Sequence, residues 1–231
     1  MDYLLHALFE AFPISSSMHL LYFRINLNNI VALHAITGLV TFIYFRNRIF
    51  YLIKDLLTNF GFAWKLVLIL LPKFVLGFCL RQYNIKLYCI TGIFFGLLFF
   101  IADFFCKQNR KIETIFCRES ICISLFSCLA FLPGSSSLGT YYTAFRFYKI
   151  NKEEALDLSF ILNIIPSLGA FILKYSTVQL NVWQILCCIF IYWMCISLCK
   201  KLTNYLYLVG IYRIVVGFLT CINTNIFSSY H

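Results

Sequence analysis

Residues 3–24 read YLLHALFEAFPISSSMHLLYFR, and residues 120–148 read SICISLFSCLAFLPGSSSLGTYYTAFRFY. Both stretches are apolar, and a proline followed by a run of three serines interrupts each of them in the middle. An apolar helix needs about 20 residues to cross a bilayer, so no half of either stretch can cross alone. Broken backbone at membrane depth is tolerated only where protein buries it or where it lines a wet cavity. We therefore predict two re-entrant helical hairpins, with a site between their tips.

The overall composition supports a membrane protein. The chain has 231 residues, of which 61% are hydrophobic and 12% are charged, and its mean hydropathy is +0.84. Soluble domains are nearer about 45–50% apolar and about 25% charged, so this chain cannot cover a water-facing globule. An aromatic content of 19% excludes disorder. The net charge of +10 fits loops that set orientation on an anionic leaflet better than it fits a nucleic-acid partner.

Further apolar stretches are long enough to form full spans. We predict an all-α polytopic membrane protein, with residues 1–231 as a single integral membrane domain and about six transmembrane helices. The predicted spans are 29–45, 64–80, 87–105, 155–174, 178–198 and 204–222. Most of the 11 cysteines lie in apolar runs and form no CxxC pair, so a zinc site or a disulfide framework is not expected.

The two broken stretches resemble each other, and each is followed by a span that carries a proline and then a glycine: Pro72 and Gly77, Pro166 and Gly169. This pattern predicts an inverted repeat, an arrangement that places binding sites at the interface between the repeats. Chance similarity in so apolar a chain is the alternative. If most Lys and Arg residues lie on the inside, the first hairpin enters from the outside and the second from the inside.

Ionisable side chains within apolar segments are costly, which makes them functional candidates. The first hairpin carries His6, Glu10 and His19, and His6 and Glu10 share one helix face because they are four residues apart. The alternative is that the serines are helix caps and that His19 is a core histidine. In the second hairpin, Gly134 permits close approach to the backbone, and the amides that open the next helix favour an anion such as phosphate.

The run Glu10-Ala11-Phe12-Pro13-Ile14-Ser15-Ser16-Ser17-Met18-His19 resembles the EFLPVSSTGH element of the undecaprenyl-diphosphatases, the bacitracin-resistance phosphatase family. LAFLPGSSSLG, which ends at Gly139, resembles that family's LALxPGxSRSG element. An early match to its P…LG element lies at Pro72, and matches to its FSFLLxxPxxxGA and YRIxxG elements lie after the second break, at Ser159 and Arg213. The resemblance covers nearly the whole chain.

The resemblance implies hydrolysis of undecaprenyl diphosphate to undecaprenyl phosphate and phosphate, which recycles the lipid carrier for peptidoglycan and other envelope polymers. It implies a multi-pass protein of the bacterial inner (plasma) membrane, with a cavity that opens to the periplasmic face. The oligomeric state stays open. The family is described as depending on a divalent cation, Mg²⁺ or Ca²⁺, which Glu10 would bind here. Carried over, the catalytic residues are Glu10, Ser16, His19 and Ser136, and the predicted substrate-binding residues are Ser15, Ser17, Gly134, Ser135, Ser137 and Arg213.

This chain departs from the family pattern at the charged positions. His6 replaces the first acid or amide of an acidic pair, Ser127 replaces a glutamine, and Ser137 replaces an arginine. Arginine suits a diphosphate because its fork binds two oxygens and keeps its charge. Arg213 or Arg146 could supply the charge, although Arg146 is expected to be an interfacial anchor. Two alternatives to an active phosphatase stay open: a non-catalytic protein that binds or translocates a lipid diphosphate, and a decayed inactive homologue.

Overall fold

A computed structural model describes residues 2–23, 30–58, 61–79, 88–107, 109–173 and 181–222. The described chain is helical, with one isolated β-bridge between Arg110 and Ile150. The α-helices are α1 (Asp2–Ala11), α2 (Ser16–Tyr22), α3 (Ile30–Tyr44), α4 (Arg46–Thr58), α5 (Ala63–Cys79), α6 (Tyr88–Phe105), α7 (Cys117–Ser127), α8 (Ser137–Phe147), α9 (Lys152–Leu173), α10 (Val182–Lys201) and α11 (Tyr207–Ile222). Three short 3₁₀ helices join them, η1 (Ile112–Thr114), η2 (Cys128–Phe131) and η3 (Thr203–Tyr205).

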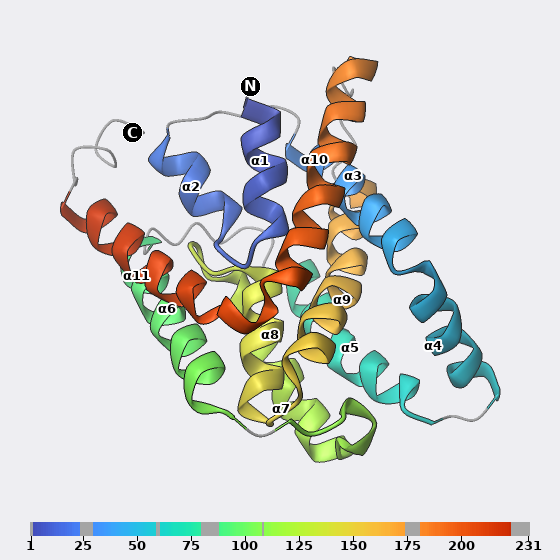
Figure 1. Ribbon diagram of the computed structural model, residues 1–231. Coiled ribbons are helices and arrows are strands. Elements are labelled where there is room, and N and C mark those ends of the chain that lie inside the picture. Colours follow the sequence, from blue (N-terminus) through green and yellow to red (C-terminus); the bar gives the residue numbers. More distant parts are fainter. Residues whose placement is uncertain are drawn as a thin grey trace.

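Two broken helical hairpins enter the bundle from opposite ends. In Figure 1, α1 and α2 descend from the top of the molecule, and α7 and α8 rise from the bottom. Their tips meet in the middle, where a Cβ on Gly139 would lie 3.2 Å from the carbonyl oxygen of Pro13. Both predicted breaks are therefore confirmed as breaks between helices, and the tips lie together.

The remaining helices surround the hairpins. The α3 helix packs along α9, α1 packs on α10, and α5 packs on α7. The second hairpin also packs on α9 and α6 through α8. Because α8 lies inside this ring, most of its side chains from Leu138 to Arg146 are buried. The central position of α8 places the second tip in the core of the bundle.

The α6 and α11 helices form the most extensive pair in the fold. Their backbones approach closely because glycines face each other: a Cβ on Gly210 would lie 2.8 Å from the backbone nitrogen of Phe100 and 2.9 Å from the carbonyl oxygen of Gly96. Small residues at such contacts are typical of helix pairs within membranes. The pair carries Arg213, which lies on α11 and is only 1% exposed.

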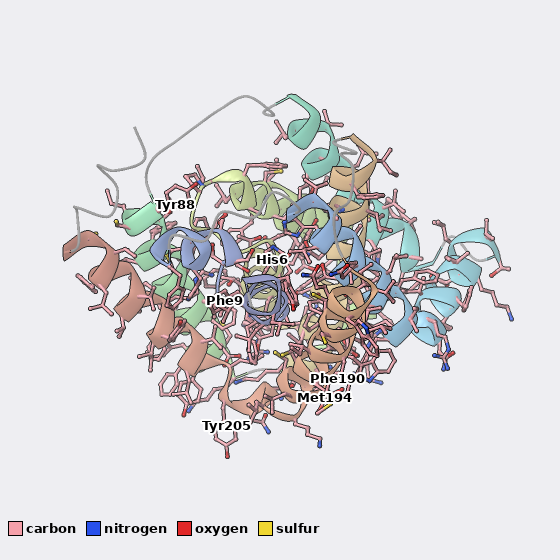
Figure 2. All side chains as sticks on the ribbon, turned by 90° about the horizontal axis from the view of Figure 1, so that it is seen from above. His6, Phe9, Tyr88, Phe190, Met194 and Tyr205 are labelled. Carbon is pink, nitrogen blue, oxygen red and sulfur yellow. The ribbon has the colours of Figure 1, made fainter. Side chains whose placement is uncertain are left out.

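The outer surface of the bundle is apolar. Figure 2 shows Phe190 and Met194 on the outward side of α10, whereas His6 and Phe9 lie near the middle of the molecule. Among the described helices, α6 and α10 are long and apolar enough to cross a membrane, and α4 with α5 would make a third span if that pair, bent by 101°, is one span. The α3 and α11 helices are shorter apolar helices. The described part thus confirms a helical protein with two or three apolar spans, and the count of six stays a prediction.

Two features of the fold differ from the sequence expectations. The α4 helix was not among the predicted elements, because its many charged residues lower its average apolarity. Its apolar face is narrow and includes the buried residues Ile49 and Leu52. Arg146 is not an interfacial anchor: it is fully buried and donates to the carbonyl oxygens of Cys106 and Ile150. Its guanidinium also lies 3.9 Å from the buried carboxylate of Asp103. The Asp103 carboxylate and the two accepting carbonyl oxygens replace the water that the guanidinium loses on burial, which accounts for this placement.

Candidate active site

A cavity of about 200 Å³ lies between the two hairpin tips. Hydroxyls dominate its polar lining, and they come from both breaks. Glu10 and His34 add a carboxylate and an imidazole, and four apolar residues complete the lining. The lining residues are Phe9, Glu10, Phe12, Ser15, Ser16, Ser17, His34, Ala130, Ser135, Ser136, Ser137 and Leu138. Segments about 120 residues apart in the chain therefore share one polar cavity.

The first tip brings a hydroxyl against a carboxylate. Ser15 has a φ of 69°, in the left-handed region, and this turn reverses the chain between α1 and α2. Ser16 follows as the first residue of α2, and its hydroxyl donates to Glu10 Oε2 over 2.7 Å. Glu10 lies in the last turn of α1, so the reversal is what makes this contact between residues six apart. A hydroxyl held on a carboxylate is the arrangement of a nucleophile and its base.

His19 lies behind the first tip rather than in the cavity lining. Its Nδ1 lies 2.8 Å from the carbonyl oxygen of Ser15, and its Nε2 lies 2.8 Å from the hydroxyl of Tyr212. A carbonyl can only accept, so Nδ1 carries the proton and Nε2 accepts from Tyr212. The imidazole also stacks on Tyr212 with ring centroids 5.5 Å apart. His19 therefore joins α2 to α11, and it makes no direct bond to Glu10.

The second tip presents the start of a helix to the cavity. Gly134 has a φ of 79°, and a Cβ there would lie 2.8 Å from the carbonyl oxygen of Tyr88, so only glycine suits this turn. Ser136 caps α8 by accepting from the backbone nitrogen of Gly139 over 3.1 Å. The amides of the first turn of a helix have no partner within the helix. They favour an anion in the cavity.

Arg213 joins the two tips to each other. Its two terminal nitrogens donate to the carbonyl oxygens of Pro13, over 3.2 Å, and of Gly134, over 3.0 Å. These carbonyls belong to the two breaks, where the helical hydrogen-bond pattern is lost. The guanidinium satisfies both of them with a single rigid fork.

Lys73 brings a buried basic side chain to the second tip. It is 4% exposed, and its Nζ donates to the Ser137 hydroxyl over 2.5 Å. The Ser137 hydroxyl in turn donates to Asn163 Oδ1 over 2.6 Å. The Lys73 Nζ also lies 4.2 Å from the centre of the Tyr141 ring, in a cation–π contact. Ser137 is the position at which the sequence lacks the arginine of the resembled family, so a basic side chain lies beside that position in space.

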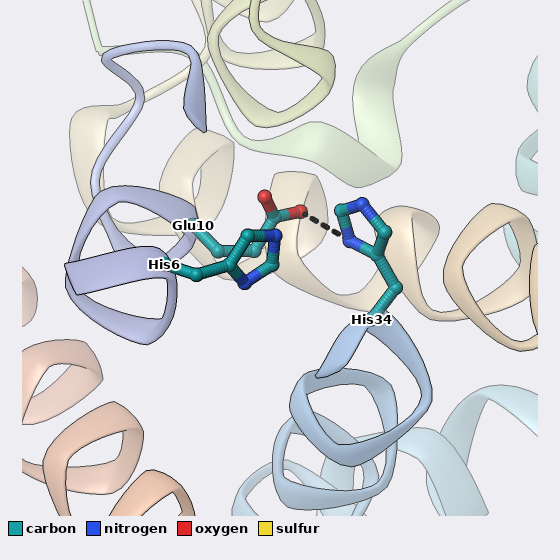
Figure 3. Close-up of side chains that lie close together, drawn as sticks. All are labelled: His6, Glu10 and His34. Atoms are coloured by element: carbon teal, nitrogen blue, oxygen red, sulfur yellow. Dashed lines mark ion pairs between the residues drawn. The ribbon is translucent and has the colours of Figure 1, made fainter. Parts of the chain in front are cut away.

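Glu10 also contacts His34, whose ring in turn lies against His6. Its Oε1 lies 3.3 Å from Nδ1 of His34, which projects from α3. The His6 ring lies edge-on to the His34 ring, with centroids 4.9 Å apart (Figure 3). His6 is fully buried, and neither of its ring nitrogens has a hydrogen-bond partner in the described part of the chain. These three residues bring metal-ligating atoms within 4.8 Å of one another.

The structure thus gathers most of the predicted site residues. Glu10 and the serines at 15–17 and 135–137 line the cavity, whereas Gly134, His19 and Arg213 support its walls. The roles predicted for them stay predictions. The sequence reasoning missed Lys73 and His34 as site residues. Both are ionisable residues within predicted apolar spans, so the rule that singled out His6, Glu10 and His19 would also have found them.

The fold and the site define a helical membrane protein with a polar cavity at the meeting point of two opposed broken helices. The family model described as "Bacitracin resistance protein BacA" matches residues 4–219. The chain belongs to the bacitracin resistance protein BacA family.

Relatives of this chain carry a functional name. An undecaprenyl-diphosphatase of Methanococcus maripaludis is 28% identical over 192 residues, which cover 76% of this chain and 77% of the relative. An undecaprenyl-diphosphatase of Alteromonas mediterranea is 31% identical over 186 residues, or 71% of this chain and 70% of the relative. One of Trichlorobacter lovleyi is 31% identical over 188 residues, or 71% and 69%. The family resemblance found in the sequence is confirmed.

Proposed function

We propose that this protein is an undecaprenyl-diphosphatase, which hydrolyses the lipid diphosphate to undecaprenyl phosphate and inorganic phosphate. The observation that carries the proposal is the shared cavity, in which Ser16 donates to Glu10 opposite the start of α8. The family and the names of the relatives supply the substrate. The protein then recycles the lipid carrier of envelope polymers, and its activity would lower sensitivity to bacitracin.

The second tip binds the diphosphate in this proposal. The amides at the start of α8 and the hydroxyl of Ser136, which lines the cavity, would donate to phosphate oxygens. The Ser135 hydroxyl donates instead to the carbonyl oxygens of Ala130 and Leu132 and so shapes the tip. Lys73 contributes a positive charge through Ser137. Charge stabilisation of this kind is needed because phosphoryl transfer depends on groups that neutralise the oxygens in the transition state. The lysine makes up for the missing arginine of the family motif.

The first tip supplies the chemistry. Ser16 Oγ attacks the terminal phosphorus while Glu10 accepts its proton, so a bond from Oγ to phosphorus forms and the bond to the undecaprenyl phosphate oxygen breaks. Glu10 passes that proton to the departing undecaprenyl phosphate. Water then attacks the phosphorus of the phosphoserine and gives a proton to Glu10; the bond from phosphorus to Oγ breaks, and the proton on Glu10 passes to Ser16 Oγ as phosphate leaves. His19 and Arg213 hold the two tips in register through Ser15, Pro13 and Gly134. We therefore expect substitutions of His19 or Arg213 to lower activity by displacing the tips rather than by removing a group that reacts.

The donor set around Glu10 suits a divalent cation. His6 is fully buried, and within the described part of the chain neither of its ring nitrogens has a hydrogen-bond partner, so either nitrogen could ligate an ion. His6, Glu10 and His34 would hold such an ion. When bound, it would supply positive charge to the phosphate oxygens.

The arrangement in the membrane is part of the proposal. We assign both hairpins as re-entrant, with the α1–α2 hairpin entering from the outer face and the α7–α8 hairpin from the inner face, in an inverted repeat with six full spans. The opposed hairpins of Figure 1 and the meeting of their tips support this assignment. The protein would be a multi-pass protein of the plasma membrane.

Release of phosphate from undecaprenyl diphosphate by the purified full-length protein tests the function. We expect Ser16→Ala and Glu10→Gln to lower the turnover number at least about 100-fold, because each removes a group needed at the reacting phosphorus. Ser197→Ala is the matched control, since Ser197 lies on α10 and its hydroxyl donates to Trp193 and Tyr44, away from the cavity. Turnover that survives both cavity substitutions would refute the assigned roles.

The non-catalytic alternatives predict a different result. A binding or translocating protein would retain the lipid diphosphate without releasing phosphate, and a decayed homologue would neither bind nor hydrolyse it. The intact contact between Ser16 and Glu10 favours the enzyme.

A further inference from the structure

The cluster of His6, Glu10 and His34 contains two kinds of ligand. His6 and Glu10 come from successive turns of α1, and His34 comes from α3, so two helices converge on one point (Figure 3). The candidate ligand atoms all lie within 4.8 Å of one another, close enough for small side-chain rotations to bring them onto a single ion. The surroundings of His6 independently indicate a ligand. His6 is fully buried, and both of its nitrogens lack a hydrogen-bond partner among the described residues.

We propose that this cluster binds a transition-metal ion of the Zn²⁺ or Co²⁺ type, in preference to Mg²⁺ or Ca²⁺. The inference deepens the proposed function and rests on it for the role of the ion. Mg²⁺ and Ca²⁺ take oxygen ligands, of which this cluster offers a single carboxylate. Two imidazoles with one carboxylate are a donor set that transition metals accept, and zinc enzymes use it. The substitution of His6 for an acid or amide therefore changes the class of metal.

The geometry gives such an ion an open side. Glu10 and His34 line the cavity, whereas His6 is buried behind them. Because Glu10 and His34 border the cavity, a phosphate oxygen in the cavity could complete the coordination of an ion held by these three residues. Three protein ligands with one open position are the pattern of a catalytic metal site. Both imidazoles must offer a lone pair to the ion, so the affinity of the site for metal depends on pH.

Metal binding without substrate tests the inference separately from hydrolysis. The full chain is purified without a histidine tag, stripped with a chelator, and titrated with Co²⁺, Zn²⁺, Mg²⁺ or Ca²⁺, while elemental analysis and the visible absorption of Co²⁺ report binding. We expect about one Co²⁺ or Zn²⁺ per chain, and at least about 100-fold weaker binding in His6→Ala and His34→Ala, since loss of a mere supporting partner already weakens a site about 10–100-fold. His19→Asn is the matched control and should keep the site.

One variant tests the choice of metal directly. His6→Glu places a second carboxylate beside Glu10, so it should weaken Co²⁺ binding at least tenfold and strengthen Mg²⁺ or Ca²⁺ binding. Binding of Co²⁺ that persists in both alanine variants would point to cysteine thiols and overturn the inference. Equal affinity of the unchanged protein for Mg²⁺ and Co²⁺ would also overturn it. If Co²⁺ binds as expected but phosphate is not released, the metal site stands and the phosphatase assignment fails.

Discussion

Lys73 is an ammonium group enclosed by helices, and its neighbours explain why it can stay there. It follows Pro72 within α5, and its side chain reaches Ser137 at the start of α8 and the face of Tyr141. A buried charge needs such partners because it has lost its hydration. The same contacts place the charge one hydroxyl away from the cavity. The Lys73 side chain on α5 thus supplies the basic group that the second hairpin lacks at Ser137.

Removing this charge should lower activity without unfolding the protein. We expect Lys73→Met to reduce the turnover number at least about 100-fold, because it removes an electrostatic donor near the transferred phosphoryl group. The midpoint of thermal unfolding should stay the same or rise, since an apolar chain of similar length replaces a desolvated charge. Phosphate release and thermal unfolding in detergent measure the two effects.

A rescue experiment separates a charge effect from a packing effect. Ser137→Arg in the Lys73→Met background restores a cation at the cavity and should recover part of the lost turnover, whereas Ser137→Ala in the same background should not. Failure of the arginine to restore any activity would show that Lys73 acts through packing.

The α6–α11 pair shows how helices set the position of a functional side chain. Gly96 lies against Arg213 and Gly210, and a Cβ on Gly96 would come within 2.9 Å of the Arg213 Cβ. Close packing of the two backbones therefore fixes the direction in which Arg213 leaves α11. From there its fork reaches both tips. Packing between two outer helices controls the alignment of the cavity walls.

A methyl group at this contact should separate the helices. We expect Gly210→Ala to destabilise the protein by about 1–3 kcal/mol, because the added Cβ would meet backbone atoms that cannot move aside. This corresponds to a drop of several degrees in the unfolding midpoint. Gly169→Ala on α9 is the matched control, because a Cβ there meets nothing within 4 Å. It should be neutral or slightly stabilising. An equal loss of stability in both variants would contradict the packing explanation.

The whole molecule is organised around two hairpins of opposite direction. Short helices such as α2 cannot cross a bilayer, and they are stable here because α11, α6 and α9 surround the tips. Opposed hairpins also bring the two helix breaks together, so that the Arg213 guanidinium can donate to a backbone carbonyl of each break. Residues of both breaks therefore line the same polar cavity.

The opposed directions can be tested by chemical labelling in cells. Cys117 is exposed at the start of α7, and Asn181 is exposed at the start of α10. If the hairpins enter from opposite faces, a membrane-impermeant maleimide should label Asn181→Cys in intact cells and should label Cys117 only after permeabilisation. Peptide mass spectrometry reads each cysteine separately. Labelling of both sites from the same face would refute the proposed topology.

The sequence alone determined the helical membrane character, the two breaks, the family and most of the cavity residues, because apolarity, proline–serine interruptions and buried ionisable groups are properties of local sequence. It left α4 undetected and misjudged Arg146, since burial depends on what packs around a helix. Only the tertiary structure brought Lys73 beside Ser137 and His34 beside Glu10. These pairs join helices that are distant in the chain, and a sequence pattern carries no record of which helices pack against each other.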